Sequence, residues 1–261
     1  MSSSFPLREF RVRMAGASDV GKKRTQNEDR WAIFEDDPIM VVADGMGGHA
    51  AGEVAAGLAV DTLREYFQIS ADIHQRTWPF RVQRTGDTEL RRMKAGVQWA
   101  NQRIYEASLA AKHLKGMGTT VVAVLFFENT LWCCHVGDSR LYRFRDNTLL
   151  QMTEDHSLRN EYYKNPLEPI LQTPPTRNVL LRALGVEPRV IVDVTQDAPQ
   201  LGDVYLVCSD GLSEMVSEEE ICALINTADS LQEACDQLIE LANDHGGEDN
   251  CTVVLARIED L

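Results

Sequence analysis

The sequence has no long hydrophobic run, and no apolar stretch reaches the roughly 18 residues that a membrane-spanning helix needs. Serines and a mixed segment follow Met1, where a signal peptide would have an apolar core. There are six cysteines, none in a C-x-x-C pair and most within apolar runs, which indicates buried free thiols in a reducing compartment. We therefore expect a cytoplasmic protein that does not insert into a membrane.

Basic residues are also scarce. The chain has 26 Lys and Arg against 40 Asp and Glu, which gives a net charge of −14. Because nucleic-acid-binding proteins usually present a basic face, that class is disfavoured. The 261 residues, 44% of them hydrophobic, contain no repeat and no Pro/Ser-rich linker. This predicts a single domain over residues 1–261, which we expect to be monomeric.

Periodicity predicts a mixture of strands and helices. Alternating or β-branched runs predict strands at 31–34, 39–42, 119–127, 131–136, 141–145, 149–152, 190–194, 204–208 and 251–258. Apolar residues at helical spacing predict helices at 50–67, 90–113, 217–224 and 230–243. Segments 70–89 and 155–181 are predicted to be irregular. Strands in meanders and helices in pairs indicate an α+β fold of two packed antiparallel sheets flanked by helix pairs.

Four aspartates stand at the ends of apolar runs, beside glycine or asparagine. Asp44, Asp138 and Asp210 follow such runs, and Asp249 precedes one. One aspartate at a strand end is ordinary turn chemistry, but four suggest carboxylates gathered at one rim of the sheets. Two such charges 4 Å apart would repel by about 4 kcal/mol at an effective dielectric of 20. Hard cations such as Mg²⁺ or Mn²⁺ are the natural counter-charge for these oxygens.

Other stretches allow more than one interpretation. Arg24 precedes Glu28 by four residues, and Asp29 follows Glu28 directly. This stretch fits either a phosphate and metal site or a charged surface loop. The run from Gly45 fits the G-x-G-x-x-[G/A] dinucleotide pattern. That pattern needs an acidic residue at the end of the next strand, whereas Asp61 lies inside a predicted helix. A metal-binding loop or a plain turn fits better.

Cys134 and Arg140 have the C-x₅-R spacing of cysteine-dependent phosphatases. That chemistry needs a helix after the loop, because the helix N-terminus lowers the pKa of the thiol. Residues 141–145 alternate like a strand, and Asp138 would repel a phosphate from inside the loop. We therefore expect Cys134 to be packed in a strand. His135 is interpreted as a core histidine.

Seven stretches, in this order, resemble the bacterial form of the PP2C-type metal-dependent protein phosphatase family. They are Arg24-x-x-x-Glu28-Asp29, Asp44-Gly-Met-Gly-Gly-His49, Gly116-Met-Gly-Thr-Thr120, Val136-Gly-Asp-Ser-Arg140, Arg182-Ala-Leu-Gly185, Ser209-Asp-Gly-Leu212 and Asp249-Asn250. The resemblance covers nearly the whole chain. It implies a central β-sandwich with helix pairs on both outer faces, a four-layer α-β-β-α arrangement.

The resemblance also implies two Mn²⁺ or Mg²⁺ ions at one end of the sandwich. Asp44 would bridge both ions. The other implied metal ligands are Asp210 and Asp249 for one ion, Glu28 and the Gly45 carbonyl for the second, with Asp29 nearby through water, and Asp138 with Asp210 for a third, weaker ion.

The implied activity is hydrolysis of phosphoserine and phosphothreonine in proteins by a metal-activated water, with Arg24 holding the phosphate. Asp44, Asp210 and Asp249 join Arg24 as the expected catalytic residues. Phosphorylated proteins would be the substrates, and a bacterial Ser/Thr kinase would catalyse the opposing reaction. The alternative is a catalytically weak regulatory module of the same fold that binds phosphoproteins.

Two positions depart from the family pattern. Met46 stands where animal members carry a histidine taken as the acid for the leaving group. The candidate donors here are His49, His156 or a metal-bound water. Glu214 stands where the family often has aspartate, which bears on the third ion. Residues 157–181 match a flap that varies between members.

Overall fold

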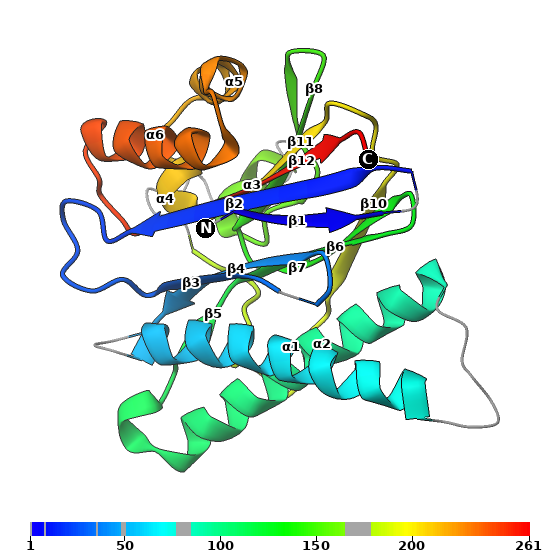
Figure 1. Ribbon diagram of the computed structural model, residues 1–261. Helices are drawn as coiled ribbons and strands as arrows, with labels where there is room; N and C mark the ends of the chain where they lie inside the picture. The colour runs from blue at the N-terminus through cyan, green and yellow to red at the C-terminus, as the bar shows by residue number, and fades with distance from the viewer. Residues whose placement is uncertain (1, 8, 35, 48–50, 77–84, 165–178) are drawn as a thin grey trace.

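Two antiparallel sheets face each other at the centre of the computed structural model, which describes residues 2–7, 9–34, 36–47, 51–76, 85–164 and 179–261 (Figure 1). The first sheet contains, in spatial order, β1 (Ser2–Pro6), β2 (Arg11–Asp19), β12 (Cys251–Glu259), β11 (Val204–Cys208), β8 (Arg140–Arg145) and β9 (Thr148–Gln151). The second contains β10 (Asp193–Asp197), β7 (Thr130–Val136), β6 (Val121–Phe127), β4 (Ile39–Met46) and β3 (Asp29–Ile33), with β5 (Gly118–Thr119) paired to β4.

A pair of helices covers the outer face of each sheet (Figure 1). The long helices α1 (Ala51–Arg76) and α2 (Gly86–Ala110) pack on the second sheet, and α5 (Glu218–Thr227) and α6 (Leu231–Asp244) pack on the first. The shorter helices are η1 (Lys112–Leu114), α3 (Leu158–Lys164) and α4 (Asp210–Ser213). The predicted α+β sandwich with helix pairs on both outer faces is confirmed. No helix in the described ranges combines the length and apolar character needed to cross a membrane.

The central strands are apolar on both faces because each face meets a different core. In β4, Met40 and Val42 point between the sheets, while Ile39, Val41 and Ala43 point toward α1 and α2. Side chains alternate in direction along a strand, so a strand buried on both sides reads as a continuous apolar run. The outer sheet surfaces are therefore closed by helices, and only the ends of the strands remain accessible for a site.

The predicted loop at 70–89 is wrong at both ends. The first helix continues to Arg76, and the second begins at Gly86 rather than at Leu90. Thr85 caps the second helix, since its hydroxyl accepts a hydrogen bond from Thr88 N and the Thr88 hydroxyl accepts one from Thr85 N. A threonine at the third helical position replaces the usual Glu or Gln of this motif, which conceals the start of the helix.

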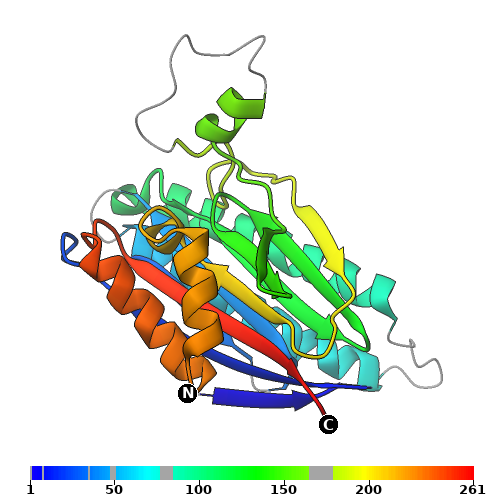
Figure 2. The ribbon, with the colours of Figure 1, turned by 90° about the horizontal axis from the view of Figure 1, so that it is seen from above.

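Two strand predictions also need correction. β1 and β2 were not expected, because Arg11 and Arg13 interrupt a weakly apolar run; yet Val12 and Met14, which alternate with these arginines, are fully buried between the sheets. The strand predicted at 190–194 begins only at Asp193. Of the predicted flap at 157–181, only 157–164 and 179–181 are described, and the first of these pieces carries α3, which projects from the sandwich (Figure 2).

A buried cation ties the two long helices to the turn before β4. The side chain of Arg92 on α2 is only 4% exposed. Its Nη1 donates to Glu89 over 3.1 Å, and its Nη2 contacts Asp37 at 3.3 Å and donates to the Phe67 carbonyl over 2.6 Å. Its guanidinium also lies 4.2 Å from the centre of the Phe67 ring. Two carboxylates, a carbonyl and an aromatic face therefore meet at one guanidinium.

We expect Arg92→Met to lower the free energy of unfolding by about 3–5 kcal/mol, because a buried guanidinium that pairs with two carboxylates is removed. Urea denaturation of the metal-free protein measures it. Arg103→Met is the matched control on the same helix: Arg103 pairs with Glu65 at the surface and should contribute less than about 1 kcal/mol. Equal losses in the two variants would contradict this interpretation of the buried cluster.

Candidate active site

The pairing of β3 with β4 places two aspartates directly opposite each other. Asp29 is the register partner of Asp44. The backbone of Asp44 is held on both sides by threonines, since Asp44 N donates to Thr120 Oγ1 over 2.9 Å and Thr119 Oγ1 donates to Asp44 O over 2.8 Å. The register of this hairpin therefore determines the position of the first pair of carboxylates.

Two further aspartates, Asp210 and Asp249, come from the opposite sheet, and Asp138 lies between β7 and β8. Asp210 begins α4 directly after β11, and Asp249 lies just before β12. Ser209 links the two groups: its Oγ donates to Asp29 Oδ2 over 2.7 Å and accepts from Thr252 N over 3.0 Å. The carboxylates therefore meet where the two sheets end side by side.

Asn250 positions the loop that carries Arg24 and Glu28. Its Oδ1 accepts from Glu28 N over 2.7 Å, and its Nδ2 donates to the carbonyls of Val20 and Gln26, each over 2.9 Å. Arg24 Nη2 in turn donates to Asp249 over 2.6 Å. One buried amide thus fixes a segment more than two hundred positions earlier in the chain.

Glycines allow the backbone to approach closely at this rim. A Cβ on Gly45 would lie 2.1 Å from the Gly52 carbonyl oxygen, and one on Gly52 would lie 2.7 Å from Glu28 Oε1. A Cβ on Gly211 would lie 2.0 Å from the Asn250 carbonyl oxygen. These contacts leave no room for a side chain, which explains why glycine follows Asp44 and Asp210.

A cavity of about 410 Å³ opens over these residues. The predicted site residues that line it are Arg24, Glu28, Asp44, Gly45, Asp138, Asp210 and Asp249. Asp29 lies behind this lining and is only 2% exposed. His49 lies outside the described residues.

Three carboxyl groups of this cavity, those of Asp44, Asp138 and Asp210, have a raised pKa. Burial raises the pKa of Asp44 well above its ordinary value, and the charges of Asp29 and Asp210 raise it further. Burial and Asp249 raise the pKa of Asp210 to about 6, and burial and Asp210 raise that of Asp138 to about 7. Desolvation and like charge both disfavour the ionised form, so the cavity needs positive charge to hold ionised carboxylates.

The donor atoms of the cavity fit a hard divalent cation. Most are carboxylate and carbonyl oxygens, and the described lining residues include no cysteine or histidine. Glu28 Oε1 and Asp29 Oδ1 are buried and have no hydrogen-bond partner in the described part of the chain. Buried oxygens without a donor are costly, and a cation in this cavity would satisfy them.

His156 lies elsewhere. It is 8% exposed and does not line the cavity. Its Nδ1 accepts from Gly137 N over 3.0 Å, its Nε2 lies 3.1 Å from Asp193, and its ring stacks on His135 at 4.8 Å between centroids. Burial lowers the pKa of His156. This placement does not support a role as proton donor; the imidazole supports the loop before Asp138.

Cys134 is fully buried within β7, as expected, and burial raises the pKa of its thiol to about 12. A thiol that holds its proton is a poor nucleophile. We expect Cys134→Ser to keep turnover of p-nitrophenyl phosphate within about threefold of the wild type, because the change is nearly isosteric and outside the cavity. Loss of turnover with an unchanged melting temperature would instead support a mechanism in which Cys134 is the nucleophile.

Sequence reasoning did not assign roles to Thr120, Ser209 and Asn250. Each lies within one residue of a predicted motif carboxylate or at the end of a motif. The sequence feature that could have identified them is a small polar side chain at the beginning or end of a strand. Their partners, however, are distant in sequence, and only the sheet register brings them together.

Both the sequence and the fold of this chain are similar to those of known proteins. Residues 16–246 match the profile of the family described as protein phosphatase 2C. The serine/threonine phosphatase stp of Listeria welshimeri is 40% identical over 243 residues, which cover 91% of this chain and 92% of the relative. The crystal structure of the Mycobacterium tuberculosis serine/threonine phosphatase PstP superposes with a TM-score of 0.81 at 36% identity, covering 95% of this chain and 99% of that chain. The PstP catalytic domain in complex with 2 manganese ions gives a TM-score of 0.80 at 36% identity, with coverage of 95% and 99%.

Proposed function

The chain belongs to the protein phosphatase 2C family and is a metal-dependent protein serine/threonine phosphatase, and we propose that the carboxylate cavity with Arg24 at its wall is its catalytic centre. The main support for this assignment is that carboxylates carried by both sheets lie together beside the Arg24 guanidinium. All ligands expected from the sequence are present, which favours an active enzyme over a regulatory module that only binds phosphoproteins.

The ions would be Mn²⁺ or Mg²⁺. Asp44 would contact two of them, and the remaining ligands would be Asp210 and Asp249 for one ion, Glu28, the Gly45 carbonyl and, through water, Asp29 for the other, and Asp138 with Asp210 for a third. When bound, the ions supply Lewis-acid stabilisation of phosphoryl oxygens and lower the pKa of water. Asn250 accepts a hydrogen bond from the backbone N of Glu28 and Ser209 donates one to the Asp29 carboxylate, and these bonds hold both residues in place.

Arg24 would bind and orient the substrate phosphate. Its side chain is half exposed at the cavity wall and uses Nη2 on Asp249, which leaves other N–H donors. A planar guanidinium matches two phosphoryl oxygens at once and favours negative charge that develops on them. The phosphoserine or phosphothreonine would therefore enter with its phosphoryl group between Arg24 and the carboxylates.

Turnover of a phosphothreonine peptide with Mn²⁺ tests the assignment, and EDTA should abolish that turnover. Arg24→Ala should lower kcat/KM by about 10²- to 10³-fold, because one preorganised donor to the phosphoryl group is lost. Lys22→Ala is the control: it removes a neighbouring exposed cation that pairs with Asp244 outside the cavity. Activity that survives EDTA, or tight peptide binding without turnover, would refute the proposed role.

We also propose the wider setting of the reaction. The substrates would be proteins phosphorylated by a Ser/Thr kinase, and this chain would reverse that modification as a monomeric single domain. The six cysteines are free, which supports a reducing compartment such as the cytoplasm. Phosphoproteomes with and without this protein would identify the substrates.

A further inference from the structure

A groove continues from the catalytic cavity toward α2. A second cavity of about 250 Å³ shares Met46 and Leu180 with the catalytic cavity. A third cavity of about 760 Å³ shares Arg189, Val190 and Ile191 with the second. The three cavities therefore adjoin one another, from the carboxylates to α2.

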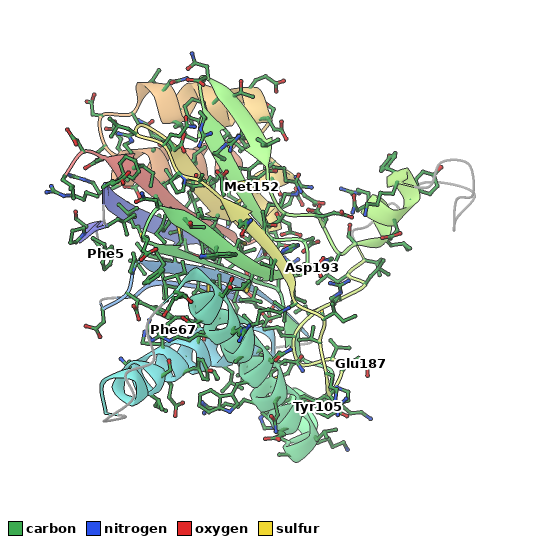
Figure 3. All side chains as sticks on the ribbon, turned by 90° about the vertical axis from the view of Figure 1, so that its right-hand side faces the viewer. Phe5, Phe67, Tyr105, Met152, Glu187 and Asp193 are labelled. Atoms are coloured by element: carbon green, nitrogen blue, oxygen red, sulfur yellow. The ribbon has the colours of Figure 1, made fainter. Side chains whose placement is uncertain are left out.

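The wall of this groove is held rigidly. Asn101 on α2 is 1% exposed; its Nδ2 donates to the Glu187 carbonyl over 3.0 Å, and its Oδ1 accepts from Gly185 N over 2.9 Å. Figure 3 shows Glu187 at the same edge of the molecule as Tyr105, which is on α2. Leu184 exchanges backbone hydrogen bonds with Thr119, which also holds Asp44. The groove and the catalytic carboxylates therefore share one framework.

The lip of the groove is apolar and exposed. Val179, Leu181, Val186 and Ile191 are 48%, 54%, 47% and 72% exposed, respectively. Four exposed aliphatic side chains within thirteen positions are more than the scattered apolar residues of an ordinary surface. Across the groove, Gln98 of α2 offers an amide. An aliphatic lip opposite polar side chains suits an extended peptide, which presents backbone polar groups and apolar side chains together.

We propose that this groove binds the polypeptide next to the phosphorylated residue and selects substrates that carry an aliphatic side chain there. The inference rests on the proposed function, since the groove gains a ligand only if the phosphoryl group is held in the adjoining cavity. Its continuity with that cavity through Met46 and Leu180 identifies the occupant as the substrate chain itself. Ile191, the most exposed of the four, is the main specificity-determining residue.

The test uses phosphothreonine peptides with a serine and glycine background, in which one leucine is moved through the flanking positions. One or two positions on one side should raise kcat/KM about tenfold, the usual gain from burying an aliphatic side chain. Ile191→Ser should remove this preference, and Ile191→Leu should keep it. Leu201→Ser, a control that changes another exposed leucine outside the groove, should leave the preference intact.

Hydrolysis of p-nitrophenyl phosphate separates the groove from the catalytic centre. The ratio of peptide to p-nitrophenyl phosphate turnover should fall in Ile191→Ser. Equal losses for both substrates, or no preference for any leucine position in an active wild type, would overturn the groove proposal. A dimer that Ile191→Ser dissociates, with an unchanged substrate ratio, would assign the lip to a second copy and also overturn it. A wild type that hydrolyses neither substrate with Mn²⁺ would instead refute the proposed function, and the groove with it.

Discussion

Asp44→Asn is expected to lower phosphatase turnover by on the order of 10³-fold or more while leaving the fold intact. Asp44 lies at the centre of the carboxylates, opposite Asp29 in the β3–β4 hairpin. An amide offers one neutral oxygen instead of a charged pair, so the cations that stabilise the transition state would be bound weakly. The measurement is kcat/KM for p-nitrophenyl phosphate over a range of Mn²⁺ concentrations.

The matched control is Asp61→Asn, which changes an exposed aspartate on α1 far from the cavity lining. It should leave kcat/KM within about twofold of the wild type. Circular dichroism should show the same fold in both variants. Turnover of Asp44→Asn close to that of the wild type at saturating Mn²⁺ would contradict the bridging role of Asp44.

The metal-free enzyme is expected to lose stability as the pH rises from about 4 to about 7. Asp29 shows the sign: burial raises its pKa from 3.8 to about 7 in the folded chain. Between these values the folded state binds a proton that the unfolded state has released, so raising the pH favours unfolding. The full penalty, on the order of 4 kcal/mol for one such group, is present above pH 7 and absent below the unfolded pKa.

Thermal unfolding in EDTA across this pH range measures the effect, with Asp44→Asn for comparison. The stability advantage of Asp44→Asn over the metal-free wild type should grow with pH, because burial and neighbouring carboxylates also raise the pKa of Asp44. Mn²⁺ should reverse the order, since ligand at 100 times its Kd adds about 2.7 kcal/mol to the wild type. A difference between the variants that does not change with pH would contradict the electrostatic account.

The position of the aspartates at strand ends was sufficient to predict their convergence. Asp44, Asp138, Asp210 and Asp249 all line one cavity, as their place after or before apolar runs suggested. A buried strand gives a strong apolar pattern in the sequence, and its end must lie at a rim of the sheet. A two-sheet fold then leaves few places where four such ends can meet.

Interactions that depend on strand order could not be predicted from the sequence. β2 lies between β1 and β12 in the sheet, and its arginines concealed a strand that only the pairing with β12 explains. His156 sat in a promising motif, but its ring is directed to Gly137 and Asp193 by contacts that no local pattern encodes. Similarly, the groove along α2 is made by Asn101 and a loop 84 positions later.

The place of β12 has a consequence for the biosynthesis of the enzyme. This last strand inserts between β2 and β11, and Asp249 and Asn250 directly precede it. While the ribosome still covers these residues, the nascent chain lacks Asp249, a proposed metal ligand, and the amide that holds the Arg24 loop. Phosphatase activity should therefore begin only after β12 has left the ribosome and has paired with β2 and β11.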